Sequence, residues 1–561
     1  MGTWGLAALV GVFYAGPLLS LAVGAFRNTA PGQPGHWTLA AWRALVADER
    51  LREALGNALL LASANLLIAV PLAVLLAWLA VRSDLPGRRA ITPAMLVMFA
   101  LPSLFYAMGY ELLANPYTGL LNGILGRLGV AFRFNIETLT GLVAVNTFRC
   151  VAFSYLFLLG PVKALASEQE EASRTAGRSA TATFWRISLP ALAPAISAAA
   201  LFALMGGLEV FDLAMIIGVP ANLPIVAVQL YDWLSQPQPR YGQASALALS
   251  LVALLALAMA LRTRGLGARG FVSIGGKAQR RGGLSLGYAR WPLSALVWAY
   301  LGAAQLLPIG TLIYASFQPL PGVAGPLGLV HYRVLFASPG VASAVGNTFW
   351  LAATLGATVS ACGLALAQLQ QSLPALPRRW IQLCTAAPLA MPGVVVALAI
   401  TWSYVATPGL RALYGSFAMM SIALLIALTP LAVQLGQASL AQVAPQLFEA
   451  ARVCGATPLA AWFSITLRLC LPGFLAGWYL ALIAIAGALD IPLLLGGPGL
   501  ETLATQVFTF NARGQPGEAA ALLCVLLLFI LLPLLPLAAW RARQRLLPLF
   551  TRSRDDSYRT A

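Results

Sequence analysis

The sequence predicts an all-α integral membrane protein, with about 12 transmembrane helices arranged as two parallel six-helix repeats. Composition is the first reason, because 60% of the 561 residues are hydrophobic and only 9% are charged. Soluble domains carry about 25% charged residues. The second reason is a series of apolar runs of about 20 residues, the length that crosses the hydrocarbon core. The third is an internal repeat of polar and glycine motifs.

The apolar runs are expected to be helices, because open sheet edges are excluded from lipid. The first run lacks a basic leader and a small-residue cleavage site, so we expect a span there and not a cleaved signal. The predicted spans are 4–26, 55–81, 91–114, 138–160, 191–218, 242–261, 292–316, 343–369, 381–406, 415–436, 471–496 and 516–540.

Charge predicts the orientation of these spans. If both termini are cytoplasmic, 24 of the 35 Lys and Arg residues fall on the cytoplasmic side. This asymmetry follows the positive-inside rule, and it explains the net charge of +17 without a nucleic-acid partner. The six cysteines form no CxxC pair and lie in or beside apolar segments, so we expect core packing and no metal site.

Motifs recur along the chain at two offsets. At an offset of 290 residues the second copies are Gly346-Asn347 for Gly56-Asn57, Arg378-Arg379 for Arg88-Arg89, and Pro392 for Pro102. At an offset of 278 they are Glu449 for Glu171, Gly455 for Gly177, and Asp490 for Asp212. Each copy holds an even number of spans, so both halves enter the membrane in the same direction and a pathway is expected between them.

The repeat also sets the expected domain boundaries. We expect a first transmembrane half at 1–262, a basic cytoplasmic linker at 263–290, a second half at 291–545 and a cytoplasmic tail at 546–561. The linker is rich in Gly and Arg and holds no acidic residue, as expected of a flexible segment near anionic headgroups.

Two matched loops follow the fourth and tenth predicted spans. In the first, Ser167 and Glu170 predict a capping box that opens a short helix, and Gly177 predicts a left-handed turn that ends it. A second amphipathic segment then leads back to the membrane. The second loop repeats the design, with glycine six residues after glutamate in both copies.

These loops resemble the "EAA" loop of binding-protein-dependent ABC importer permeases. The copies depart from the family pattern at Ser173, which replaces an alanine, and at Arg468, which replaces a proline. The resemblance implies that each loop forms a coupling helix for a separate ATPase subunit. By this resemblance, the residues expected to couple the chain to the ATPase are Glu171, Ala172, Gly177, Glu449, Ala450 and Gly455.

The resemblance also implies the setting of the chain. It would be a multi-pass protein of a bacterial cytoplasmic (inner) membrane. Its partners would be the lipid bilayer, two copies of the ATPase and an extracytoplasmic solute-binding protein. ATP and Mg would bind the ATPase, so we expect no cofactor and no enzymatic activity in this chain. A secondary carrier of the major-facilitator kind is the alternative from another class. Such a carrier does not need matched cytoplasmic loops.

The solute is less sharply predicted. Fused double permeases resemble the ferric-iron and thiamine importer branches, among others. The segment 208–220, Leu-Glu-Val-Phe-Asp-Leu-Ala-Met-Ile-Ile-Gly-Val-Pro, looks more like the ferric-iron branch. Iron(III) is therefore the solute we expect, with thiamine, polyamine and aminoethylphosphonate left open.

Among the carboxylates inside predicted spans, three are candidates for the translocation pathway. Glu209 and Asp212 are placed in the fifth span and Asp490 at the equivalent of Asp212 in the eleventh. A charged carboxylate at a helix centre costs roughly 2.5–3.5 kcal/mol, so such groups usually face a cavity or a partner. Three residues apart, Glu209 and Asp212 would share one helix face. They either line a pathway for a cationic solute or brace the helix ends near Gly218 and Gly496, or pair with Arg149.

Overall fold

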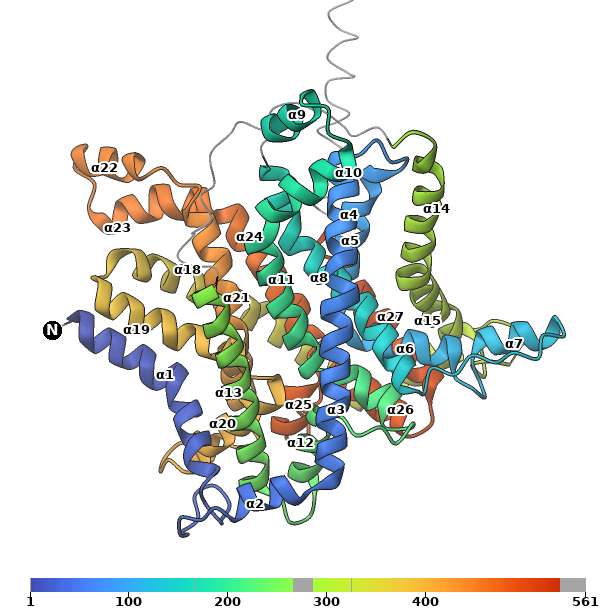
Figure 1. Cartoon of the computed structure of the whole chain (residues 1–561). Helices are drawn as coiled ribbons and strands as arrows, with labels where there is room; N and C mark the ends of the chain where they lie inside the picture. The colour runs from blue at the N-terminus through green and yellow to red at the C-terminus, as the bar shows by residue number, and fades with distance from the viewer. Residues whose placement is uncertain (1, 166, 266–285, 324, 535–561) are drawn as a thin grey trace, which may run out of the picture.

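The computed structural model describes residues 2–165, 167–265, 286–323 and 325–534. Throughout these ranges the chain forms helices joined by turns, with no β-strand (Figure 1). Most of the predicted linker 263–290 and the whole predicted tail 546–561 lie outside the described residues. The predicted all-α membrane fold is confirmed.

Nine helices in the described residues are long and apolar enough to cross a membrane, or eleven if each of two bent pairs counts as one span. A further apolar helix, α27 (Pro516–Leu531), covers the start of the twelfth predicted span and has only 16 residues. The nine are Trp4–Gly24, Glu49–Arg82, Leu139–Ala164, Phe184–Leu208, Tyr241–Arg262, Gly287–Phe317, Pro339–Ser372, Phe417–Leu440 and Trp462–Ala486.

The third and ninth predicted spans are not single helices. In the first half α5 (Arg88–Ala100) and α6 (Ser103–Ala114) meet at 96°. In the second half the helical segment Ala375–Ala390, which contains α19 (Ala375–Ala386), meets α20 (Gly393–Val405) at 118°. The break precedes Pro102 and Pro392, because proline disfavours helical backbone in the residue before it. Leu101 and Met391 are accordingly extended.

The fifth and eleventh predicted spans end earlier than predicted. Helix α11 (Leu189–Leu208) stops before Glu209, and a short helical segment resumes at Asp212. Helix α24 (Leu467–Ala486) stops likewise, and α25 (Asp490–Leu495) begins at the equivalent aspartate. The prediction that Glu209 and Asp212 share one helix face is therefore wrong. Carboxylates are favoured at helix N-termini by the helix dipole, and both aspartates occupy that position.

The two halves correspond element by element. Helices α2 (Ala40–Ala47) and α16 (Val330–Ala337) have eight residues each, and α12 (Val226–Ser235) and α26 (Leu503–Ala512) have ten each. The change of offset from 290 to 278 has a structural cause. The first half carries an arm with α7 (Leu120–Arg127) between α6 and α8 (Leu139–Ala164). The second half has a shorter connection between α20 and α21 (Phe417–Leu440).

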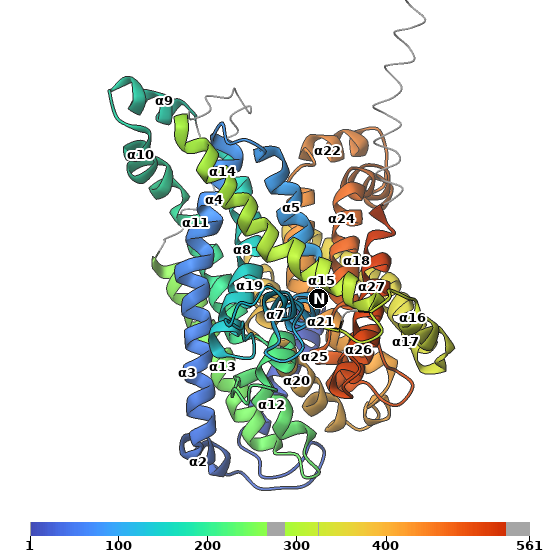
Figure 2. The ribbon, with the colours of Figure 1, turned by 90° about the vertical axis from the view of Figure 1, so that its right-hand side faces the viewer.

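The first span of each half packs on the other half. Helix α1 (Gly2–Gly24) lies against α19 and α20 (Figure 1), and the Tyr14 hydroxyl is 3.0 Å from Thr429 Oγ1. Helices α14 (Arg290–Leu301) and α15 (Leu307–Phe317) pack along the first half (Figure 2), where Tyr110 donates a hydrogen bond to the Ala303 carbonyl. Each half therefore packs its first span against the other half, and these contacts join the two halves.

This packing between the halves predicts that the linker is dispensable for assembly. Splitting the chain near Gly275, outside the described residues, and co-expressing both parts should yield halves that co-purify and transport solute. Helix packing between the halves does not depend on the covalent join. Gly24→Leu is the matched control, because a Cβ there would lie 2.6 Å from Trp402 Nε1 and disturb the α1 contact. Split halves that insert but do not transport would show a specific role for the linker.

Candidate functional site

The two loops predicted to couple to an ATPase lie at the same end of the molecule. Helices α9 (Ser167–Thr175) and α22 (Pro445–Val453) have nine residues each. Figures 1 and 2 show both at the top of the bundle, whereas α2 and α12 lie at the bottom. The repeat therefore places one short helix from each half where a partner could contact both.

The predicted glycine turns are confirmed. Gly177 has φ 80° and Gly455 has φ 86°, both in the left-handed region that side chains with a Cβ avoid. The same backbone bond closes each turn, from Arg178 to the Ser173 carbonyl and from Ala456 to the Ala451 carbonyl. This six-to-one bond is the signature of a Schellman motif, so each glycine ends its helix and reverses the chain.

The acidic and small residues of the motif face outward. Glu171, Ala172, Glu449 and Ala450 are all exposed, and neither glutamate makes an ion pair within the described part of the chain. An exposed carboxylate on a short helix is free to meet a basic group of a partner. The structure thus brings the predicted coupling residues onto two surface helices, and their role remains a prediction.

One ionic contact ties the first loop to the bundle. Arg82, at the end of α4 (Val70–Arg82), lies 3.5 Å from Glu170 and also donates to the Val162 carbonyl. Ser188 donates to the other Glu170 oxygen at 2.8 Å. In the described residues Glu170 therefore braces the loop against α4, and the predicted capping box with Ser167 stays a prediction. The side chain of Ser167 lies outside the described part of the molecule.

The central carboxylates lie at the breaks between helices. Glu209 follows the last residue of α11, and Asp212 and Asp490 begin the next helical segments. The charge of Asp490 acts on both Glu209 and Asp212, and that of Arg149 acts on the same two in the opposite sense. The structure therefore brings the three predicted acids together across the two halves. Each is half-buried.

Each aspartate also meets the start of the broken helix in its own half. Ser103, the first residue of α6, donates its hydroxyl to Asp212. Gly393, the equivalent first residue of α20, lies so close to Asp490 that a Cβ there would collide with the carboxylate. Helix N-termini favour such negative groups by about 0.3–1 kcal/mol. The sequence did not single out Ser103 or Gly393, although both directly follow the proline of each copy.

The helix break at Pro102 in the first half contacts the helix break at Gly487 in the second half. A Cβ on Gly487, at the end of α24, would collide with the Pro102 ring of the first half. Gly487 stands at the position equivalent to Glu209, so only the first half carries a third acid. The centre is therefore asymmetric, with two braced aspartates and one glutamate, and among the described residues none of the three makes an ion pair with Arg149.

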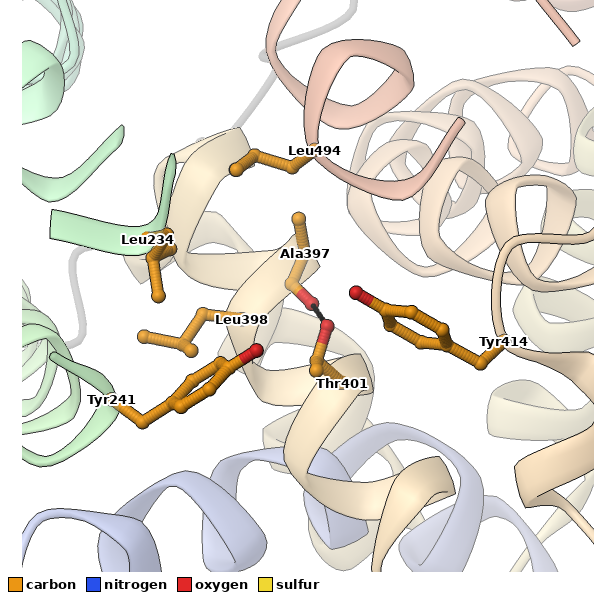
Figure 3. Close-up of a pocket in the computed structure, with 7 residues that line it drawn as sticks. All are labelled: Leu234, Tyr241, Ala397, Leu398, Thr401, Tyr414 and Leu494. Atoms are coloured by element: carbon orange, nitrogen blue, oxygen red, sulfur yellow. Dashed lines mark hydrogen bonds between the residues drawn. The ribbon is translucent and has the colours of Figure 1, made fainter. Parts of the chain in front are cut away.

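A small cavity of about 40 Å³ lies at the same interface. It is lined by Leu234, Tyr241, Ala397, Leu398, Thr401, Tyr414 and Leu494. Figure 3 shows the hydroxyl ends of Tyr241 and Tyr414 directed toward Thr401 from opposite sides. The Thr401 hydroxyl donates to the Ala397 carbonyl at 2.9 Å. A cavity of this size has room for a few water molecules. Within the described residues, no group of three or more His, Cys, Asp or Glu side chains is placed to hold a metal ion.

Comparison with known proteins identifies the family. Residues 359–541 match the family of the binding-protein-dependent transport system inner membrane component. The chain is 33% identical over 184 residues to a putative ABC transporter permease of Streptomyces antibioticus. That alignment covers 33% of this chain and 73% of the relative.

Two further relatives are named for ferric iron. The chain is 23% identical over 499 residues to an Fe(3+)-transport system permease of Haemophilus influenzae, covering 87% of this chain and 90% of the relative. It is 22% identical over 329 residues to a ferric transport system permease of Actinobacillus pleuropneumoniae, covering 58% of this chain and about half, 47%, of that relative. The chain belongs to the family of binding-protein-dependent ABC importer permeases.

Proposed function

We propose that this permease carries iron(III) inward when separate ATPase subunits close beneath its two loops. The observation that carries the proposal is the pair of matched loops, each an exposed helix ended by a left-handed glycine at the same end of the bundle. Closure of two ATPase subunits would move these helices together. Because α1 and α15 cross to the opposite half, this movement would reach the interface as a rigid-body shift.

The central carboxylates support a cationic solute. Glu209, Asp212 and Asp490 lie where the broken helices of both halves meet, and broken helices commonly form the solute pathway of transporters. With three acidic residues and one arginine in this region, the net charge would favour a cation there. The relatives named for ferric transport point to iron(III) within that class. A polyamine would suit the same charges.

The partners follow from the same proposal. A solute-binding protein would deliver iron(III) at the end that carries α2 and α12, and two ATPase subunits would bind at the end with α9 and α22. This places the loops on the cytoplasmic side, in agreement with the distribution of Lys and Arg. The chain itself would hydrolyse no ATP.

The test is reconstitution of the complex purified from native membranes through a tag on this chain. Proteoliposomes containing ATP should take up radioactive iron(III) supplied as its citrate complex with the co-purified binding protein. Putrescine and thiamine are the comparison solutes. Uptake of one of these instead would overturn iron(III) while keeping the importer. Uptake without ATP, driven by a proton gradient, would instead indicate a secondary carrier.

A further inference from the structure

The two coupling loops differ in chemistry at matched positions. In α9 the residues Gln169, Glu170 and Thr175 stand where α22 has Leu447, Phe448 and Val453. Leu447 is 47% exposed and Val453 is 88% exposed. Thr175 is exposed too, and its hydroxyl donates to the Glu171 carbonyl. The first loop therefore presents polar groups where the second presents aliphatic side chains.

The bonds that hold each loop differ as well. In the first loop Glu170 contacts Arg82 and Ser188, and the hydroxyls of Ser173 and Thr183 lie 2.9 Å apart. The second loop has none of these pairs, because apolar or uncharged residues stand at the equivalent positions. These are Phe448 for Glu170, Ser372 for Arg82, Ala451 for Ser173 and Ala461 for Thr183. The first loop is braced on its own bundle, and the second lacks that polar brace.

The partner that would cover the exposed aliphatic side chains of the second loop can be identified. Glu449 and Arg452 are exposed on the same helix as Leu447 and Val453, so apolar and charged side chains share its solvent-facing surface. A lipid surface would not require exposed charges of both signs on this helix. The loop lies at the end of the bundle assigned above to the ATPase, so that subunit is the partner that fits.

We propose that the two loops bind their ATPase subunits unequally, and this inference rests on the proposed function of the loops. The second loop makes an apolar contact through Leu447 and Val453 that supplies most of the affinity. The first loop makes a weaker, polar contact through Glu171 and its neighbours. The recognition surface on one ATPase subunit is therefore an aliphatic pocket, and a single kind of subunit would occupy the second loop first.

The test exchanges the two chemistries. Leu447→Gln with Val453→Thr gives the second loop the side chains of the first, and Gln169→Leu with Thr175→Val is the matched reciprocal variant. Retention of the ATPase subunit, identified by mass and quantified on the tagged chain, should fall on the order of tenfold for each lost aliphatic contact in the first variant. The reciprocal variant should retain at least as much as the unchanged chain. Salt should weaken the contact of the first loop more than that of the second.

Cys454 supplies an independent readout, since it lies next to Val453 and is the only one of the six cysteines, all of them in the described residues, that is classed as exposed. In vesicles of the full chain, a water-soluble maleimide should label Cys454 without the ATPase and be blocked when the ATPase is bound. Labelling blocked without the ATPase would mean that lipid covers this loop, and would overturn the proposal. Equal losses of retention in both exchange variants would also overturn it. Full retention in every loop variant, including Gly177→Val with Gly455→Val, would instead overturn the proposed function of the loops.

Discussion

Replacing Gly177 and Gly455 together by valine should abolish ATP-driven uptake while leaving the chain inserted in the membrane. Both glycines have a positive φ, and a β-branched residue is strained there by roughly 1–2 kcal/mol at each site. A Cβ at either position would have no neighbouring atom within 4 Å, so the cost comes from the backbone and not from a clash. The turn would open, α9 and α22 would lose their orientation, and closure of the ATPase would no longer reach the bundle.

Gly56→Val with Gly346→Val is the matched control. These two glycines are also equivalent in the repeat, lie in helices and have open space around them, but neither has a positive φ. The control should transport solute as the unchanged chain does. Uptake and ATPase retention should be measured in the same membranes. Unchanged values for both quantities in the Gly177 and Gly455 variant would rule out a role for these turns in coupling.

The apolar runs of the sequence predict the helical fold well, but not where helices break. Segments 91–114 and 381–406 are mostly apolar, so hydropathy alone shows one span in each. Pro102 and Pro392 carried the missing signal, because the residue before a proline is pushed out of the helical region. The sharp bends also depend on tertiary packing, such as that of α6 against α15, which a single sequence does not display.

The same distinction applies to the candidate site residues: local features could be predicted from the sequence, and contacts between distant residues could not. Glycine six residues after glutamate was enough to predict the two turns, since a left-handed helix end is a local property of the chain. The Arg82–Glu170 and Ser103–Asp212 contacts join residues 88 and 109 positions apart. No local pattern indicates them. The wrong placement of Glu209 and Asp212 on one helix face has the same origin, because an apolar run continues through the break at Glu209.

Changing Asp212 and Asp490 together to asparagine should lower uptake on the order of tenfold or more, while ATP hydrolysis stimulated by the binding protein is largely kept. The substitution preserves size and replaces two of the three carboxyl groups at the centre, which can carry negative charge, by neutral amides. If these charges attract a cationic solute, the barrier to passage rises, and each 1.4 kcal/mol slows passage about tenfold. Glu209→Gln should have a smaller effect of the same sign, since both aspartates would remain.

Bracing and attraction can be separated at this site because Ser103 supplies the hydrogen bond and Asp212 the charge. Ser103→Ala removes the donor to Asp212 and leaves all three carboxylates in place. If the acids line the pathway, this variant should transport nearly as well as the unchanged chain. If they only hold the start of α6, Ser103→Ala should be impaired as strongly as Asp212→Asn, and both should lose thermal stability. Unchanged uptake in the Asp212 and Asp490 variant would remove the pathway role and leave the carboxylates as helix braces.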